Sequence, residues 1–507
     1  MIVVIDFGSQ TANLIERRIR DFGVTTKFLP PEEGFEFIKK EKPTAIIFSG
    51  GPSSVYDEGA PTIDPEIFKL GTPILGICYG MQLMMLLDNG KVISGKKEYG
   101  PSRLTVKKDH PLLKGLPEEL TVWMSHGDEV IEIPEHFETV ASTTTVPYCV
   151  VVDDTERLYG MLFHPEVEHT EHGDQILKNF VEMVGAEVTE KKIDIEEIIE
   201  GIRQRVGNSI VIGAVSGGVD STVAAALTAK AIGRQFFPFH VDNGLMRIGT
   251  VETVKQIFDH IGVPVDIISC EDEMLERLNG ISDPEEKRKI IGKFYIDMFE
   301  REMEKLKSQG HDVKFLLQGT IYSDVIESKG TKHASKIKSH HNVGGLPEDM
   351  QLELLEPLRT YYKDEVRSIG TELGLPEEFV WQQVFPGPGY GVRIRGELTK
   401  ERLEQERIAD KIVLEEIVKA GLFRKVFMSF AIMSGAESTA VKGDGRFFGE
   451  VVAVRVVESR DVMTSKWVHL PYEVLQSISS RIVNEVPNIS RVVYDITTKP
   501  PATMEWE

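Results

Sequence analysis

Short apolar runs alternate with amphipathic stretches in the first part of the chain. Residues 1–5, 44–48 and 73–77 are nearly continuous apolar runs, which are typical of strands buried on both faces of a sheet. Residues 11–22 instead place apolar side chains at helical spacing. Strands and helices that alternate in this way predict a parallel sheet covered by helices.

The same alternation returns after a charged segment. Residues 187–205 are rich in Glu, Lys and Ile, which indicates a solvated linker that leads into a helix. Four apolar runs then predict buried strands at residues 209–215, 236–241, 263–269 and 315–318. We therefore expect a second parallel-sheet domain after the linker.

The last part of the chain has a different pattern. The run Phe-Pro-Gly-Pro-Gly at 385–389 fits neither a helix nor a central strand and indicates a domain boundary. A helix over 398–420 is followed by β-rich segments at 450–457 and 491–496, with a helix over 471–485 between them. This pattern predicts a small α+β domain. Because a domain commonly has about 100–200 residues, three domains are expected, over residues 1–188, 189–386 and 387–507.

The chain is acidic, with a formal net charge of -22 at pH 7. A field of this sign repels phosphate backbones, so a nucleic-acid partner is not expected. A small anionic substrate would need a local basic cluster.

The cysteines and the first residues of the chain indicate in which cellular compartment the protein is expected. Cys78, Cys149 and Cys270 are far apart and odd in number, so they suggest neither a disulfide framework nor a zinc site. This favours a reducing, cytoplasmic location. Residues 1–6 have no basic region before their apolar residues, which argues against a signal peptide. No apolar run is long enough to cross a membrane, so no membrane partner is expected.

A candidate nucleophile follows one of the predicted strands. Residues 76–80 read Gly-Ile-Cys-Tyr-Gly, and residues 81–87 continue as a helix. Glycines on both sides of Cys78 predict a sharp strand-to-helix turn that exposes a nucleophile. The N-terminus of the helix would favour the reactive thiolate. The alternative is that Cys78 is a small buried hydrophobic residue, as most free cysteines are.

A base and oxyanion donors are also present. His164 and Glu166 follow a predicted strand at 159–163 and project on the same side of an extended segment, so Glu166 could orient His164. The turn Ser-Gly-Gly-Pro at 49–52 lies at the end of another strand, where sheet-top loops form sites. Taken alone, that turn could be a plain turn.

Four segments, at 49–52, 76–82, 125–128 and 164–166, together resemble the class I glutamine amidotransferases. The resemblance implies that Cys78 attacks the side-chain amide of glutamine, that His164 shuttles protons and that Glu166 orients His164. Ammonia and glutamate would form through a thioester. The resemblance also implies a set of groups that hold the oxyanion and the glutamine: Gly51, Tyr79, Gln82, Ser125 and His126.

A second candidate site opens the next predicted helix. Residues 216–222 read Ser-Gly-Gly-Val-Asp-Ser-Thr and follow the strand at 209–215. Consecutive glycines and a helix N-terminus favour an anion, whereas Asp220 beside phosphates suggests a bridging Mg²⁺. The alternative is a helix N-cap with a flexible entry. The string resembles the PP-loop of ATP pyrophosphatases, which implies ATP binding and α–β phosphate cleavage at these residues: Ser216, Gly217, Gly218, Val219, Asp220, Ser221 and Thr222.

Further segments, at 240–247, 318–322, 336–342, 385–389 and 499–507, resemble the GMP synthetases. The resemblance implies ATP- and Mg²⁺-dependent amination of XMP to GMP through an adenylated intermediate, with glutamine, ATP and XMP as small-molecule partners. It also implies a homodimer that forms through the C-terminal domain. The segment at 336–342 is a local basic cluster, which could also be a solvated face. The implied pyrophosphate and XMP contacts are Lys336, Lys338, His340, His341, Lys363, Asp364, Arg393, Lys499 and Glu505.

Two other functions would each require sequence features that this chain lacks. A tRNA-modifying PP-loop enzyme would carry paired cysteines or a basic RNA-binding face, and the sequence shows neither. A degenerate, regulatory amidotransferase would have lost its nucleophile or base, whereas Cys78, His164 and Glu166 are all present. The predicted fold is therefore α/β, with a parallel-sheet glutamine amidotransferase domain, a doubly wound PP-loop domain and a small α+β dimerisation domain.

Overall fold

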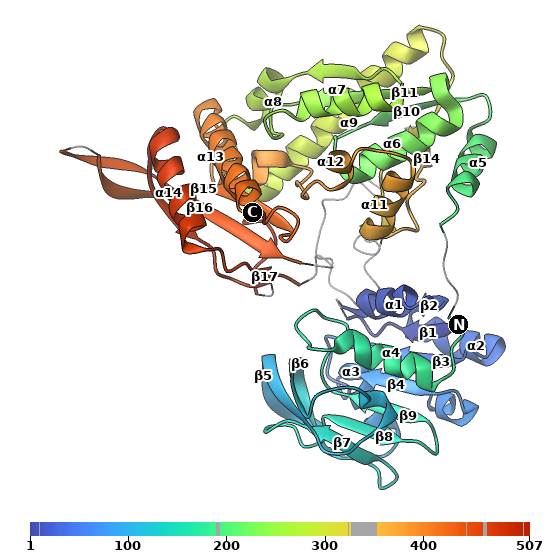
Figure 1. Ribbon diagram of the computed structural model, residues 1–507. Coiled ribbons are helices and arrows are strands. Elements are labelled where there is room, and N and C mark those ends of the chain that lie inside the picture. Colours follow the sequence, from blue (N-terminus) through green and yellow to red (C-terminus); the bar gives the residue numbers. More distant parts are fainter. Residues whose placement is uncertain are drawn as a thin grey trace. The chain divides into compact units, whose positions relative to one another are not determined.

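A computed structural model describes residues 1–9, 11–188, 193–322, 324–325, 352–442, 444–459, 464–499 and 501–507 (Figure 1). The described residues fall into two compact units, 1–188 and 193–507. The predicted contacts Lys336, Lys338, His340 and His341 lie outside the described residues.

The first unit is built on a nine-stranded sheet. Five strands are parallel, as predicted. In sheet order they are β2 (Thr26–Leu29), β1 (Ile2–Ile5), β3 (Ala45–Phe48), β4 (Ile74–Ile77) and β9 (Leu158–Met161). Four of them, β1, β3, β4 and β9, are buried along their whole length, as expected for strands covered on both faces.

Beyond β9 the sheet continues with antiparallel strands, which the sequence analysis did not predict. They are β8 (Val150–Asp153), β7 (Glu138–Ser142), β5 (Lys91–Val106) and β6 (Glu119–Glu132). In β6 buried side chains alternate with more exposed ones, so this strand lacks the continuous apolar run that marks the parallel strands.

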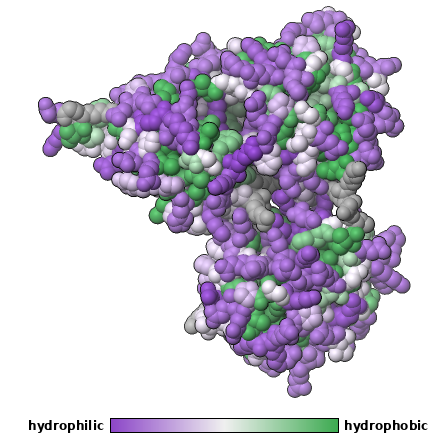
Figure 2. Space-filling view, in the orientation of Figure 1, coloured by the Kyte–Doolittle hydropathy of each residue, from purple (hydrophilic) through white to green (hydrophobic). Residues whose placement is uncertain are grey.

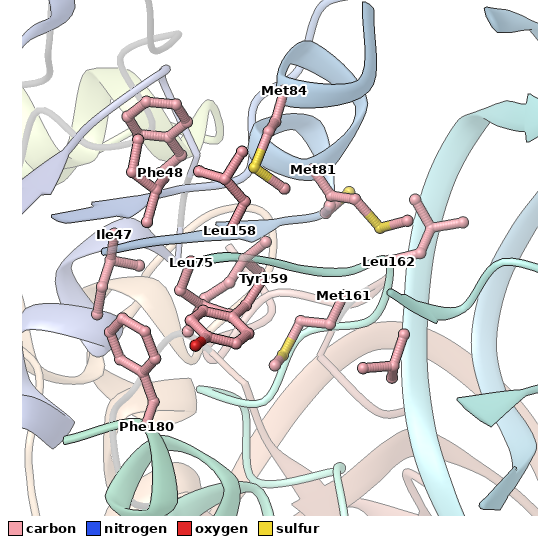
Figure 3. Close-up of a cluster of buried hydrophobic side chains, with 14 of the residues drawn as sticks. Ile47, Phe48, Leu75, Met81, Met84, Leu158, Tyr159, Met161, Leu162 and Phe180 are labelled. Carbon is pink, nitrogen blue, oxygen red and sulfur yellow. The ribbon is translucent and has the colours of Figure 1, made fainter. Parts of the chain in front are cut away.

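Helices cover both faces of this sheet. A side chain at Gly160 would meet Met81 and Met84 of α3 (Tyr79–Leu87), whereas the ring of Tyr159 packs against Phe180 of α4 (Gly173–Met183). Neighbouring residues of a strand face opposite sides, so α3 and α4 lie on opposite faces, as Figure 3 shows. The unit also contains α1 (Ala12–Asp21), α2 (Pro31–Glu41) and the 3₁₀ turns η1 (Pro65–Leu70) and η2 (Pro111–Leu113).

The second unit contains a five-stranded, fully parallel sheet. Its order is β12 (Asp266–Ser269), β11 (Phe236–Asp242), β10 (Ile210–Ala214), β13 (Val313–Leu317) and β14 (Glu353–Leu355). The chain moves outward in one direction from β10 to β12 and in the other from β13 to β14. The doubly wound fold is therefore confirmed, and its switch point lies between β10 and β13, where such folds bind ligands.

The helices of this sheet include the end of the charged segment. From residue 195 that segment is an amphipathic helix whose Ile195, Ile199 and Ile202 are buried in the core. The helices and turns are α5 (Ile195–Val206), α6 (Val219–Ile232), η3 (Gly233–Gln235), α7 (Thr250–Ile261), α8 (Glu271–Leu278), α9 (Pro284–Ser308), α11 (Lys363–Glu372) and α12 (Glu377–Val380).

The remaining part of the second unit is α+β, as predicted. A long antiparallel hairpin pairs β15 (Met428–Lys442) with β16 (Gly445–Glu458), and its far end projects beyond the helices in Figure 1. The other elements are η4 (Gly389–Val392), α13 (Lys400–Lys419), β17 (Lys466–Trp467), α14 (Tyr472–Glu485) and β18 (Ile489–Tyr494).

One hydrophobic core joins residues on both sides of the boundary predicted at residue 387. Phe294 of α9 and Ile412 of α13 belong to this same core within one compact unit. The division of residues 193–507 into two domains stays a prediction. The surface in Figure 2 is mostly hydrophilic, and no helix among the described residues has the length and apolar character that a membrane span requires.

Candidate active sites

Cys78 lies on a strained turn between β4 and α3. Its φ is 51°, in the left-handed region that residues other than glycine rarely adopt. Two glycines make this turn possible. A Cβ at Gly76 would lie 2.7 Å from the backbone nitrogen of Met81, and one at Gly80 would lie 2.5 Å from the carbonyl oxygen of Phe48. The tight backbone holds the Cys78 side chain at the carboxyl end of the parallel strands.

His164 and Glu166 form a buried pair, as their spacing predicted. The Nδ1 atom of His164 lies 2.7 Å from Oε1 of Glu166, and Glu166 is fully buried. An ionised carboxylate only accepts hydrogen bonds, so the hydrogen lies on Nδ1 and leaves Nε2 for proton transfer. Burial alone would lower the pKa of His164. The charges of Glu166 and Cys78, and hydrogen bonds to both, outweigh burial and raise this pKa well above its ordinary value.

The predicted oxyanion residues lie beside Cys78. A Cβ at Gly51 would lie 2.9 Å from the carbonyl oxygen of Phe7 and 3.0 Å from Cγ of Tyr79, so the backbone of Gly51 lies against the ring of Tyr79. Burial raises the pKa of Tyr79 to about 12, and its hydroxyl donates to the carbonyl oxygen of Pro61 at 2.5 Å. The Tyr79 ring is thereby fixed as a wall of the core.

The predicted glutamine-binding residues converge on β6. The Sγ atom of Cys78 lies 3.5 Å from the carbonyl oxygen of Ser125. The Nε2 atom of Gln82 donates to the carbonyl oxygen of Asp128 at 3.0 Å, and Nδ1 of His126 lies 2.9 Å from the same oxygen. Burial lowers the pKa of His126, so its ring is neutral near pH 7.

Two residues of α1 and its N-cap complete this site, and the sequence analysis did not select them. The hydroxyl of Thr11 donates to Oε1 of Glu166 at 2.6 Å, and Nε of Arg18 donates to the carbonyl oxygen of Glu166 at 3.4 Å. Thr11 is 155 positions away from Glu166 in the chain. No local pattern in the sequence signals such a contact.

The predicted phosphate loop lies where β10 leads into α6. Gly217 has a φ of 82°, and Gly218 is the N-cap of α6. The hydroxyl of Ser216 lies 3.0 Å from that of Ser221 and accepts from the backbone nitrogen of Gly218 at 3.2 Å. A Cβ at Gly319, just after β13, would lie 2.8 Å from the backbone nitrogen of Ser221. The loop therefore lies at the switch point of the sheet, with backbone N–H groups at a helix N-terminus.

The acidic residue of this loop pairs with a predicted basic residue. The Nζ atom of Lys363, the first residue of α11, lies 2.6 Å from Oδ2 of Asp220. Oδ1 of Asp220 is buried and has no hydrogen-bond partner among the described residues. Arg367, one turn further along α11, lies over the ring of Trp381, and burial lowers its pKa. Asp364 is the second residue of the same helix.

A buried histidine supports the entry to this loop. Nδ1 of His240 on β11 lies 2.7 Å from the carbonyl oxygen of Val215, the residue before the loop. Burial lowers the pKa of His240, and its Nε2 has no hydrogen-bond partner among the described residues. The side chain therefore acts as a neutral donor that fixes the end of β10.

Family models match parts of both compact units. A family model described as "Glutamine amidotransferase class-I" matches residues 3–184, and one described as "GMP synthase C terminal domain" matches residues 415–506. A solved glutamine amidotransferase from Thermotoga maritima is 23% identical, with a TM-score of 0.28, over 39% of this chain and 88% of its own.

Curated proteins match over the whole length. The protein named GMP synthase (glutamine-hydrolyzing) from Staphylococcus carnosus is 52% identical over 514 residues, which are 100% of this chain and 98% of its own. The protein of the same name from Aquifex aeolicus is 49% identical over 511 residues, 100% of this chain and 99% of its own. This chain belongs to the glutamine-hydrolysing GMP synthase family. The resemblance found in the sequence is thereby confirmed.

Buried charges hold the C-terminal tail, residues 501–507, in place. Arg393 is fully buried, and its Nε and Nη2 atoms each donate to Glu505 at 3.1 Å. Its guanidinium carbon lies 4.6 Å and 4.0 Å from the ring centroids of Phe385 and Phe430. Two predicted site residues, Arg393 and Glu505, thus neutralise each other.

Asp410 joins this pair to the loop after β11. It accepts from Nε of Arg247 at 2.7 Å, from Nη1 of Arg393 at 3.3 Å and from the hydroxyl of Tyr390 at 3.1 Å. Burial alone would raise the pKa of Asp410, but the two guanidinium groups outweigh burial and lower it. Arg247 ends the segment 240–247 that resembles the GMP synthetases, but no contact was predicted for it, and Asp410 lies outside those segments. The backbone of Lys499, another predicted contact, pairs with that of Ser465.

Proposed function

We propose that this member of the GMP synthase family converts XMP to GMP with ATP and with ammonia from glutamine. An adenylated XMP intermediate forms, and AMP, pyrophosphate and glutamate are released. The observation that carries the proposal is the presence in one chain of a strained cysteine turn with a buried His–Glu pair and a phosphate loop at the switch point of a second sheet.

In the proposed glutaminase reaction, Cys78 attacks the side-chain amide of glutamine. Glu166 holds the hydrogen on Nδ1 of His164, so Nε2 exchanges a proton with the thiol and then with the leaving ammonia. Backbone N–H groups of Gly51 and Tyr79 stabilise the oxyanion. Gln82, Ser125 and His126 hold the amino acid, and water then hydrolyses the thioester.

In the proposed synthetase reaction, the loop at 216–222 holds the pyrophosphate part of ATP. Its N–H groups and hydroxyls, and the N-terminus of α6, favour the anion. Lys363 lies close enough to this loop to neutralise the leaving pyrophosphate, and Asp364 follows it in the first turn of α11. XMP attacks the α-phosphate through its 2-oxygen, and ammonia then displaces AMP at C2.

Asp220 fits a role in holding Mg²⁺. Its Oδ1 is buried without a hydrogen-bond partner among the described residues, which suits a cation bound partly by phosphates. No group of three or more metal-ligating side chains occurs among the residues that the structure describes. One carboxylate with phosphate oxygens and water is a common Mg²⁺ arrangement. When bound, the ion would neutralise phosphate charge.

We also propose that Arg393, Lys499 and Glu505 shape the XMP site together with Lys336, Lys338, His340 and His341. Arg393 is buried and saturated by Asp410 and Glu505, which supports a role in holding the tail in position. Lys499 precedes that tail, and Glu505 lies on it.

A homodimer in the cytoplasm completes the proposal. The β15–β16 hairpin exposes apolar side chains near its far end, with Val441 74% and Phe448 66% exposed. Such side chains on a projecting hairpin are typical of an interface. The cysteines Cys78, Cys149 and Cys270 are free thiols, which suits a reducing compartment. Light scattering of the pure protein would show twice the mass of one chain, and a monomer would contradict the proposed dimer.

Product analysis tests the reaction. The full-length protein is incubated with ATP, Mg²⁺, XMP and glutamine, and nucleotides are separated by chromatography. Equal amounts of GMP, AMP, pyrophosphate and glutamate are expected. ADP as the nucleotide product would contradict the role of the phosphate loop.

A further inference from the structure

We infer that the hydroxyl of Thr11 positions the carboxylate of Glu166 and through it the His164 base, so Thr11 is a positioning residue of the glutaminase. The inference rests on the proposed roles of Cys78, His164 and Glu166. Thr11 does not belong to any of the segments that revealed the site in the sequence.

The first observation is that two donors converge on one oxygen. Oε1 of Glu166 accepts from the Thr11 hydroxyl at 2.6 Å and from Nδ1 of His164 at 2.7 Å. Oε2 of the same carboxylate is buried and has no hydrogen-bond partner among the described residues. The terminal torsion of glutamate is broad and roughly two-fold, so it needs an outside contact to fix it. Thr11 supplies that contact on the same oxygen that His164 binds.

The second observation is that the Thr11 hydroxyl does not cap α1, although Thr11 is the N-cap residue of this helix. At this position threonine usually accepts from a backbone N–H of the first turn. The side chain of Thr11 makes no such capping bond. The hydroxyl is directed to Glu166 instead, and threonine there has a function other than capping.

A third contact orients the Thr11 hydroxyl. Oγ of Ser9 lies 3.0 Å from Oγ1 of Thr11 and accepts from the backbone nitrogen of Thr11 at 3.1 Å. Because the hydrogen of Thr11 goes to the carboxylate, Ser9 donates to Thr11. A chain of hydrogen bonds thus runs from Ser9 through Thr11 and Glu166 to His164. The bond that Ser9 donates polarises the Thr11 hydroxyl, which strengthens the bond that Thr11 donates to the carboxylate.

The Thr11 hydroxyl is not needed to hold α1 in place, because another residue of this helix makes the anchoring contacts. Arg18, on the same helix, donates to the carbonyl oxygen of Glu166 at 3.4 Å and pairs with Asp174 of α4 at 3.1 Å. These contacts hold α1 against the turn without Thr11. Loss of the hydroxyl should therefore change the orientation of the carboxylate and leave the helix in place.

The test compares Thr11→Val, which keeps the shape and removes the hydroxyl, with Thr11→Ser, which keeps the hydroxyl. Thr26→Val is a matched control, because Thr26 on β2 donates to Glu16 of the same helix at 2.9 Å, away from the triad. Glutamate release gives kcat and KM for glutamine. Thr11→Val should lower kcat about tenfold, with KM changed less than about twofold, because a charge-assisted bond is lost at the catalytic base and not at the substrate. Thr11→Ser should recover most of kcat, and Thr26→Val should keep it.

Several outcomes would overturn the inference. They are an unchanged kcat in Thr11→Val, an equal loss in Thr11→Ser, and an equal loss in Thr26→Val. Ser9→Ala is a second, milder variant that leaves Thr11 in place, and its kcat should fall about threefold. If Thr11→Val does not fold, an unchanged kcat in Ser9→Ala overturns the inference by itself.

Two further variants separate this inference from the proposed function. If Cys78→Ala and Glu166→Gln keep their glutaminase activity, the triad itself is wrong. If both lose it while Thr11→Val does not, only the role of Thr11 is wrong.

Discussion

The Nζ atom of Lys363 lies 2.6 Å from Oδ2 of Asp220, although the two residues are 143 positions apart. The contact joins the first residue of α11 to the first turn of α6, at the switch point of the parallel sheet. Both side chains keep about a quarter of their surface exposed, and ion pairs that water reaches contribute little to stability. Its place in the phosphate loop indicates that the pair serves the reaction of ATP.

Replacing Asp220 should therefore stop the synthetase reaction. We expect Asp220→Ala to lower GMP formation at least about 100-fold with glutamine and with ammonia alike, because both nitrogen donors need the same activated XMP. Asp266→Ala is the control. Asp266 lies on β12 of the same parallel sheet and forms an exposed pair with Lys305 of α9 at 3.0 Å. Chromatography of the nucleotides measures both variants. GMP formation in Asp220→Ala within tenfold of the unaltered protein would contradict the role of Asp220.

Replacing the nucleophile should separate the two reactions. Cys78→Ala should abolish GMP formation from glutamine and leave formation from ammonia largely intact, because Cys78 and the phosphate loop lie in different compact units. Cys149→Ala is the control: Cys149 is fully buried in the same unit, and burial strongly raises its pKa, so it is no nucleophile. A Cys78→Ala protein that also fails with ammonia would show that the two reactions are not separable in this way.

A glycine after β13 tests how closely the phosphate loop is packed. A side chain at Gly319 would lie 2.8 Å from the backbone nitrogen of Ser221 and 2.9 Å from the carbonyl carbon of Asp220. Backbone cannot yield as a flexible side chain does, so Gly319→Ala should displace the loop and raise the Kd for ATP about tenfold or more. Calorimetric titration of ATP measures the change.

Gly292→Ala is the matched control for Gly319→Ala. Gly292 lies inside α9, and a Cβ there meets nothing within 4 Å. Alanine favours a helix interior by about 1 kcal/mol over glycine, so this variant should be slightly more stable and bind ATP as before. If both glycine variants bind ATP with the same Kd, the close packing of Gly319 against the loop does not affect ATP binding.

The sequence predicted what depends on local pattern. The apolar runs at 1–5 and 44–48 became β1 and β3, because a strand buried on both faces leaves a continuous apolar signature. The turn around Cys78 was predictable because its glycines are adjacent to it in the chain. The strand β5 was not predictable: it contains Gly100 and Pro101, and its pairing with β6 and β7 makes it a strand.

Contacts between distant segments account for the rest. Thr11 meets Glu166 across 155 positions, and Arg247 meets Asp410 across 163. Each residue type is common on a protein surface, so only the fold shows that these side chains are buried partners. Arg393 is the reverse case, because the sequence marked it as a ligand contact and the structure shows a guanidinium already bound by Glu505 and Asp410.

The packing of α13 on α14 gives a prediction about acid stability. Glu416 of α13 accepts from Lys419 at 2.6 Å on its own helix, and from Ser477 at 2.8 Å and Arg481 at 2.9 Å on α14. These partners, Lys419 foremost, lower the pKa of Glu416 from its ordinary 4.5 to about 2. Folding therefore stabilises the ionised form of Glu416 relative to the protonated form.

The direction of the pH dependence follows from that difference. A carboxyl whose pKa is lowered by folding stabilises the protein above its unfolded pKa, and the contribution is lost as the pH falls through the folded pKa. For Glu416 the contribution is complete above pH 4.5 and disappears toward pH 2. Glu416→Gln should lower the melting temperature of the second unit at pH 7 by about 1–2 °C, as a loss near 1 kcal/mol does in a unit of this size. The difference from the unaltered protein should shrink steadily below pH 4.5.

Glu404→Gln is the control for Glu416→Gln, because Glu404 lies on the same helix with its side chain 51% exposed, and its partner Arg407 is also paired with Glu271. A carboxylate exposed to this degree contributes little to stability, so the melting temperature of Glu404→Gln should match that of the unaltered protein at every pH. Scanning calorimetry from pH 7 to pH 3 measures all three proteins. A melting difference for Glu416→Gln that stays constant over this range would show that the lost contact acts by packing and not by charge. In that case the ion pairs between α13 and α14 would not be what stabilises the C-terminal part of the chain against acid.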